Sequence, residues 1–151
     1  MKICKHSVLI GILFIFFQFT HGMAGAQTVW YVDKGATGNG DGGSWINAFL
    51  TIQDGIDAAA VGDKIWVSEG TYAESITLVS GVSVYGGFSG VETELSGRDI
   101  GAHRTVIDGS TADDGSAADH VVVMHSLLSN ARIDGFTITG GNASGIDPHD
   151  S

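Results

Sequence analysis

The 151-residue sequence contains very little cysteine, proline and basic residue. It has one cysteine, one proline and seven lysine or arginine residues, against seventeen aspartate or glutamate residues. A single cysteine cannot form an internal disulfide, a redox pair or a thiolate zinc cluster, so these sites are excluded. The net charge of −10 excludes a nucleic-acid-binding protein, because most of the surface would repel phosphates. The apolar core and the backbone must therefore hold the fold together.

Glycine and apolar residues, in contrast, are abundant. The chain contains 23 glycines, about twice the average share of roughly 7%. Apolar residues make up 43% of the sequence, which is too many for a disordered chain. We therefore expect a folded protein with many turns.

The segment 1–26 has the pattern of a secretory signal peptide. Lys2 and Lys5 precede an apolar run at positions 8–17, and Ala24-Gly25-Ala26 supplies the small residues that signal peptidase prefers. The run is too short to cross a bilayer, which takes about 20 residues. We predict cleavage after Ala26, a secreted or cell-surface location, and no membrane insertion after cleavage.

The remaining chain, residues 27–151, keeps five basic and all seventeen acidic residues, so its net charge is −12. It also loses the only cysteine, Cys4. Its length allows one domain.

A glycine-rich stretch at residues 33–44 follows a β-prone run at residues 29–32. It lacks the acidic residues that a helix-loop-helix calcium site needs at positions 37 and 48. Asp33, Asn39 and Asp41 could hold a cation, but successive tight turns explain the same residues, and we favour the turns.

One helix is predicted, at residues 52–60. Thr51 can cap its start, Asp54 completes a capping box, and Ile52, Ile56 and Ala59 recur with helical spacing. Gly62 is expected to end it. Because so short a helix is unstable alone in water, its apolar face must pack on the rest of the chain.

From residue 64 onward the sequence predicts short strands separated by glycine, at residues 64–67, 75–78, 82–85, 105–107, 120–124 and 132–139. Similar lengths of chain separate four of the strand centres, which are Trp66, Val84, Val106 and Ile133. A repeat of about 20 residues, with Ile-Asp-Gly occurring twice, favours a solenoid over an antiparallel sandwich.

The sequence also resembles right-handed parallel β-helix proteins of the pectate-lyase-like superfamily, including those related to polymorphic outer-membrane proteins. The resemblance rests on TIQDGIDAA (51–59), VGDKIWV (61–67), EGTY (69–72), VYGGF (84–88) and IDGFTITGGN (133–142). It implies an all-β parallel β-helix with a short N-terminal capping α-helix. Only about three coils fit before Ser151, so we expect residues 27–151 to be the cap and first coils of a longer domain.

The resemblance implies a fold more firmly than a function, because the superfamily contains lyases, hydrolases, epimerases and non-catalytic surface proteins. We favour a secreted or cell-surface binding or structural scaffold that recognises carbohydrate. One alternative is the N-terminal part of a polysaccharide lyase or glycoside hydrolase with its active site in later coils. Another is an adhesin or autotransporter-type passenger. We do not expect this chain alone to be an enzyme, and the sequence does not predict its oligomeric state.

Two pairs of residues are candidate binding sites. Asp108 and Asp134 recur in the two Ile-Asp-Gly segments and could share a calcium ion, with Arg104 or Arg132 as the alternative counter-charge. The competing interpretation is that each aspartate only forms a turn. Trp66 and Tyr85 are predicted to face outward, where they would either stack on sugar rings or pack under a loop.

Overall fold

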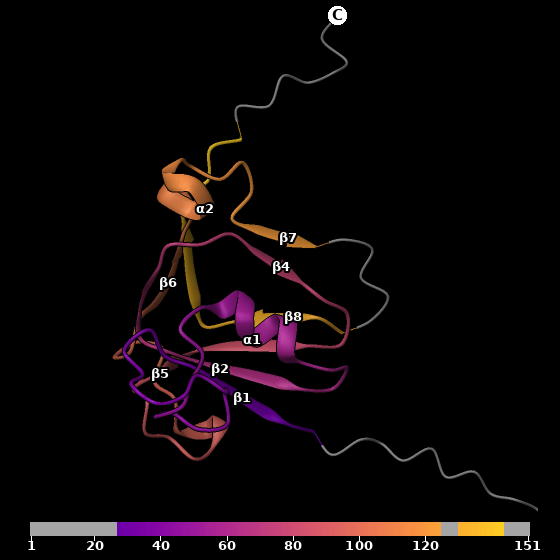
Figure 1. Ribbon diagram of the computed structural model, residues 1–151, viewed down its shortest axis with the longest axis vertical. Coiled ribbons are helices and arrows are strands. Elements are labelled where there is room, and N and C mark those ends of the chain that lie inside the picture. The colour runs from indigo at the N-terminus through magenta and orange to yellow at the C-terminus, as the bar shows by residue number, and fades with distance from the viewer. Residues whose placement is uncertain (1–26, 125–129, 144–151) are drawn as a thin grey trace, which may run out of the picture.

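The computed structural model describes residues 27–124 and 130–143 (Figure 1). In chain order the elements are β1 (Val29–Val32), α1 (Ile52–Ala58), β2 (Lys64–Ser68), β3 (Gly70–Tyr72), β4 (Ile76–Leu78), β5 (Ser83–Phe88), the 3₁₀ helix η1 (Leu95–Gly97), β6 (Thr105–Asp108), the 3₁₀ helix η2 (Gly109–Thr111), α2 (Ala112–Gly115), β7 (Val122–Met124), β8 (Arg132–Asp134) and β9 (Phe136–Thr139). The predicted signal peptide lies outside the described residues. Within the described residues, no helix is long and apolar enough to cross a membrane.

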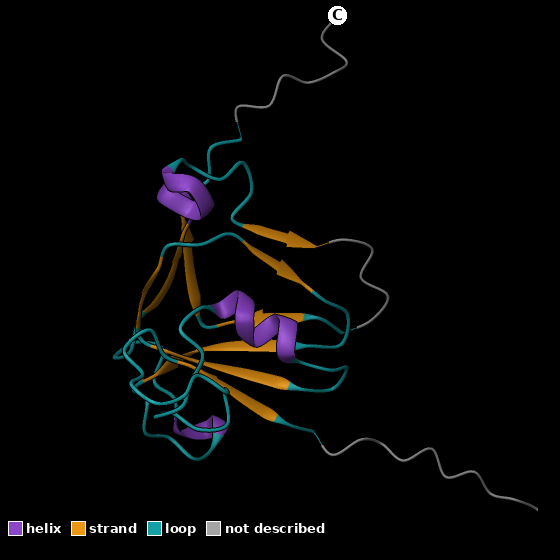
Figure 2. Cartoon of the chain, viewed as in Figure 1, coloured by secondary structure: helices purple, strands orange, loops and turns teal. Residues whose placement is uncertain are grey.

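The strands form three sheets, and every strand pair in them is parallel. The first sheet has the order β1-β2-β5-β8, the second β3-β6-β9 and the third β4-β7. Figure 2 shows these strands in orange, with α1 in purple beside them. Along the chain, β2, β3 and β4 enter the first, second and third sheets in turn, and β5, β6 and β7 repeat that order.

The prediction of an all-β right-handed parallel β-helix is wrong. The chain is a mixed α/β fold whose parallel sheets have 4, 3 and 2 strands, with few helices. A regular solenoid requires each turn of the chain to add one strand to each sheet. Between β1 and β2, however, the chain forms a loop and α1, and between β6 and β7 it forms η2 and α2. The short apolar segments separated by glycine thus form strands that pair in parallel, but the connections between these strands do not repeat uniformly along the chain.

The main core lies between the sheets and α1. Its fully buried side chains come from alternating strand positions and from the apolar face of α1: Val32, Ile52, Ile56, Ile65, Val67, Ile76, Val84 and Ile107. Thr51 caps α1 through the amide of Asp54, as predicted. The helix ends at Ala58 rather than residue 60, because Ala59 is already extended. Gly62 lies in the following turn, with a φ of 99°.

The predicted strands recur as β2, β4, β5, β6 and β7, with slightly shifted bounds, and the β-prone run at residues 29–32 is β1. Two predictions were incomplete. The segment at residues 132–139 is divided by Gly135, whose φ is 83°, into β8 and β9 of different sheets. Strand β3 is not among the predicted strands, because so short a segment carries too little alternation to indicate a strand.

Candidate functional site

An aromatic cluster lies on the face of the first sheet opposite the main core. Tyr31, Trp66 and Tyr85 occupy paired positions on β1, β2 and β5. Trp66 stacks on Phe88 with ring centroids 4.9 Å apart, and the Tyr31 ring meets it edge-on at 5.8 Å. Because aromatic side chains bury large apolar areas, this cluster is a second core.

The structure places Trp66 and Tyr85 away from the main core, as their alternation predicted, but it does not expose them. Only 4% of Trp66 and 7% of Tyr85 is accessible to solvent. Trp45, from the loop after β1, and Leu95, from η1, pack against the cluster. These two rings therefore pack under loops and offer no face to a sugar, which corrects their assignment as carbohydrate-binding residues.

Asp108 and Asp134 are not brought together. Asp108 ends β6 in the second sheet, and its carboxylate accepts a hydrogen bond from the amide of Ser110 at 2.9 Å. Asp134 ends β8 in the first sheet and forms ion pairs with Arg132 at 2.5 Å and Arg98 at 2.6 Å. Hydrogen bonds from Arg132 and then Arg98 hold the pKa of Asp134 below its ordinary value.

The two Ile-Asp-Gly segments therefore occupy different sheets and do not form one site. Among the described residues, no group of three or more histidine, cysteine, aspartate or glutamate side chains is placed to hold a metal ion. Calcium binding at Asp108 or Asp134 stays a prediction, and the two carboxylates do not lie at one common site.

The glycine-rich loop after β1 forms tight turns. Asp33 Oδ1 accepts a hydrogen bond from the Gly35 amide, and Asp41 Oδ1 accepts one from the Gly43 amide, both at 2.8 Å. The side-chain amide of Asn39 donates a hydrogen bond from Nδ2 to Asp41 Oδ2 at 2.9 Å. These are the local bonds of Asx turns, so the turn interpretation of this loop is confirmed.

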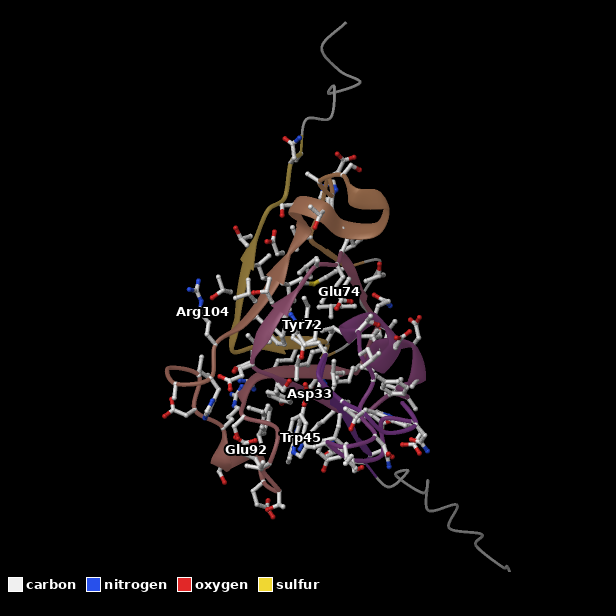
Figure 3. The ribbon with its side chains drawn as sticks, turned by 60° about the vertical axis from the view of Figure 1, so that its left-hand side comes forward. Asp33, Trp45, Tyr72, Glu74, Glu92 and Arg104 are labelled. Carbon is white, nitrogen blue, oxygen red and sulfur yellow. The ribbon has the colours of Figure 1, made fainter. Side chains whose placement is uncertain are left out.

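A groove of about 330 Å³ lies between this loop and the turn that follows β5. We call it the Asp33–Trp45 groove; it is lined by Asp33, Gly35, Ala36, Thr37, Trp45, Ile46 and Gly90. Figure 3 labels Asp33, Trp45 and Glu92 close together in the lower part of the molecule. The groove therefore unites two segments that lie far apart in the chain.

Trp45 forms one wall of the groove and is held in place by polar and apolar contacts. Its Nε1 donates a hydrogen bond to the Glu92 carbonyl at 2.9 Å. Its ring meets Tyr31 edge-on at 4.8 Å and lies 5.6 Å from Phe88. The side chain is half-buried, so the aromatic cluster supports it while the rest borders the groove.

Gly90 also lines the groove and belongs to the turn at residues 89–92, which Glu92 organises. Glu92 Oε1 accepts bonds from the amide and hydroxyl of Ser89, each at 2.8 Å, and Oε2 accepts bonds from the amides of Gly90 and Val91, each at 3.1 Å. Burial raises the pKa of Glu92, but the bonds from Ser89 and the turn amides outweigh burial and lower it. Glu92 is therefore ionised, and each of its two carboxylate oxygens accepts two hydrogen bonds.

Asp33 and Gly90 are adjacent in the lining of the groove. The φ of Gly90 is 96°, which favours glycine, and a Cβ there would lie in ordinary contact with Asp33 Oδ2, at 3.5 Å. Asp33 Oδ1 is used by the Gly35 amide, whereas Oδ2 accepts no hydrogen bond from the described residues. Together with Ile46, which is 66% exposed, the groove combines an aromatic wall, an apolar edge and a free hydrogen-bond acceptor.

A second hollow, of about 510 Å³, is lined by Glu94, Leu95, Ser96 and Arg98 around η1. Of the described residues that line it, Arg98 alone is basic, and its guanidinium already donates to Asp134 and to the Gly86 carbonyl. This leaves the Asp33–Trp45 groove as the better candidate site.

Sequence reasoning missed Trp45, Ile46 and Gly90, and for Asp33 it favoured a turn over a cation site. The available signal was a large aromatic residue directly after the glycine-rich stretch, where only polar turn residues are expected.

No protein-family model matches this chain, and the searches of curated proteins and of solved structures found no match either. The resemblance to the pectate-lyase-like superfamily therefore stays a prediction.

Proposed function

We propose that this protein is a secreted or cell-surface scaffold that binds a neutral carbohydrate in the Asp33–Trp45 groove. The observation that carries the proposal is the half-buried Trp45 ring bordering the same groove as the free Oδ2 of Asp33. An indole face packs against the C–H face of a sugar ring, and a carboxylate oxygen accepts hydrogen bonds from its hydroxyl groups.

The charge of the groove and of the whole chain favours a neutral glycan. Among the residues that the structure describes, Asp33 is the only charged one that lines the groove, and residues 27–151 carry a net charge of −12. A uronate or sulfated sugar would meet like charge both locally and over a longer range.

The carboxylates near the groove favour binding over hydrolysis. Glycoside hydrolases use two carboxyl groups about 5 to 9 Å apart, one of which is protonated before reaction. Glu92 is the carboxylate nearest in the chain to the Gly90 wall, but it accepts four hydrogen bonds and its pKa is lowered. Its role is to shape the turn, and Asp33 is left as a hydrogen-bond acceptor.

The test is a titration of the purified protein with neutral and acidic oligosaccharides, followed by calorimetry. The key variant is Asp33→Asn, because asparagine keeps an acceptor for the Gly35 amide but replaces the free oxygen with a donor. We expect it to weaken neutral-glycan binding about tenfold, which corresponds to about 1.4 kcal/mol, with little change in Tm.

The matched control is Val61→Ala, which trims an exposed side chain outside the groove. It should bind as the unmodified protein does. Failure of every neutral glycan to bind, or equal affinities of Asp33→Asn and Val61→Ala, would overturn the proposal.

A further inference from the structure

Strand β8 lies at the edge of the first sheet, and none of the described strands pairs with its outer side. The Arg132 amide donates to the Val82 carbonyl at 3.1 Å, toward the neighbouring strand. Because successive backbone amides of a strand point in opposite directions, the N–H and C=O of Ile133 point outward. Such an edge can pair with another strand.

The charges of β8 are self-complementary about Ile133. In an antiparallel pair of two β8 strands centred on Ile133, Arg132 of each copy lies opposite Asp134 of the other. The outward N–H and C=O of the two Ile133 residues then exchange two hydrogen bonds across a twofold axis. Opposite charges directly across such a pair stabilise it.

The strands at the neighbouring sheet edges, β7 and β9, each expose one large apolar side chain. Met124 of β7 is 55% exposed and Ile138 of β9 is 48% exposed, while Phe136 of β9 is half-buried against the main core. The other edge of the third sheet is covered, since α1 contacts β4 and Gln53 accepts a hydrogen bond from the Thr77 amide at 2.8 Å. Met124 and Ile138 therefore leave some apolar surface open at the strand edges beside β8.

Local charge also favours this side for self-association. The chain is strongly acidic, but Arg98 and Arg132 both contact Asp134, which leaves an excess of one positive charge in this ion-pair group. Two acidic copies would therefore repel each other less here than through most other surfaces.

We infer that the β8 edge is a homodimer interface, in which a second copy pairs antiparallel with β8 about Ile133. The exposed bond between Arg132 and Asp134 within one chain is exchanged for the equivalent bond between chains, which costs little because exposed ion pairs contribute little. Arg98 keeps its bond to Asp134 and holds the carboxylate in place. Pairing also brings Met124 and Ile138 close to the partner.

The test is sedimentation equilibrium of the purified protein from about 1 µM to 1 mM, a range that covers weak and moderate dimers. We expect a concentration-dependent dimer, and Arg132→Glu should raise its dissociation constant at least tenfold by placing glutamate opposite Asp134. Lys34→Glu makes the same charge change away from β8, on a lysine that bonds to Thr71, and should leave the dimer intact.

A second variant tests the register directly. In the proposed pair the two Ile133 Cα atoms lie about 5.5 Å apart, within disulfide range. Ile133→Cys, in a Cys4→Ala background, should form a cross-linked dimer on mild oxidation, whereas Val61→Cys should not. A monomer at every concentration, a dimer indifferent to Arg132→Glu, or an Ile133→Cys chain that fails to cross-link would each overturn the proposal.

Discussion

Asp63 connects β1 and the residue before it to the turn before β2 through hydrogen bonds, and its removal should strongly destabilise the fold. Its carboxylate accepts hydrogen bonds from the Thr28 amide at 2.9 Å, the Ala60 amide at 3.0 Å and Trp30 Nε1 at 3.1 Å. The residue is only 6% exposed. Replacing it with alanine removes both acceptor oxygens and leaves the three donors without this partner.

The magnitude follows from these three bonds. A hydrogen bond to a charged group contributes about 1.5 to 3 kcal/mol, and the three donors are only partly buried, so the lower value applies. We therefore expect Asp63→Ala to lower the free energy of unfolding by about 4 kcal/mol, and Tm by roughly 15 °C. Asp63→Asn should cost about half as much, because its amide oxygen still serves one side of the site.

The pH dependence gives an independent check. Burial raises the pKa of Asp63, but the bonds from Ala60, Thr28 and Trp30 outweigh it, so the folded pKa lies below the ordinary value. The stabilisation is complete above the unfolded pKa of about 3.9 and is lost as pH falls through the lower folded value. The difference between the unmodified protein and Asp63→Ala should shrink over that window.

The assay is urea denaturation of the unmodified protein, Asp63→Ala and Asp63→Asn at neutral pH, repeated at lower pH while the unmodified protein stays folded. Asp119→Ala is the control, because that side chain is exposed and makes no hydrogen bond with the described residues. If the free energy of unfolding of Asp63→Ala lies within about 1 kcal/mol of that of Asp119→Ala, the three hydrogen bonds to Asp63 do not stabilise the fold as proposed.

Two further substitutions probe backbone fit and helix capping. Gly87→Ala should lower the free energy of unfolding by about 2 to 3 kcal/mol, because φ is 95° and the new Cβ would lie 2.9 Å from Ile100. Gly40→Ala is the control: its φ is 70° but the space around it is open, so it should cost only about 1 kcal/mol. Equal costs measured by chemical denaturation would contradict the steric argument. Glu74→Ala should lower the free energy of unfolding by about 1 to 2 kcal/mol, because Glu74 accepts hydrogen bonds from the Ile52 and Gln53 amides at the start of α1. An unchanged Tm would show that these amides need no cap.

Local structure was largely predictable because its signals lie close together in the chain. The capping of α1 by Thr51, the inward-facing Ile65 and Val84, and the turns formed by Asp33 and Asp41 all depend on near neighbours in the sequence. Alternation also indicated that Trp66 faces away from the main core. Alternation carries no information about loops, and so it did not reveal that Trp45 covers that face.

The fold class and the candidate site were not predictable in the same way. The regular spacing of the strand centres is compatible with a uniform solenoid, but it did not reveal η2 and α2 between β6 and β7, nor the unequal number of strands in the three sheets. The repeated Ile-Asp-Gly suggested equivalent positions for Asp108 and Asp134, yet Gly109 leads into η2 and Gly135 into β9. Identical short segments took different places because their long-range partners differ.

The sequence by itself determined the acidic character, the absence of cysteine chemistry after Ala26, the apolar alternation of the strands and the short capped helix. These properties depend on composition or on neighbouring residues. Only the tertiary structure decided that Trp66 and Tyr85 are buried, that Arg98 and Arg132 meet at Asp134, and that Asp33 and Trp45 share a groove with Gly90. The physical reason is that burial and pairing depend on the free energy of packing distant segments, which no local pattern encodes.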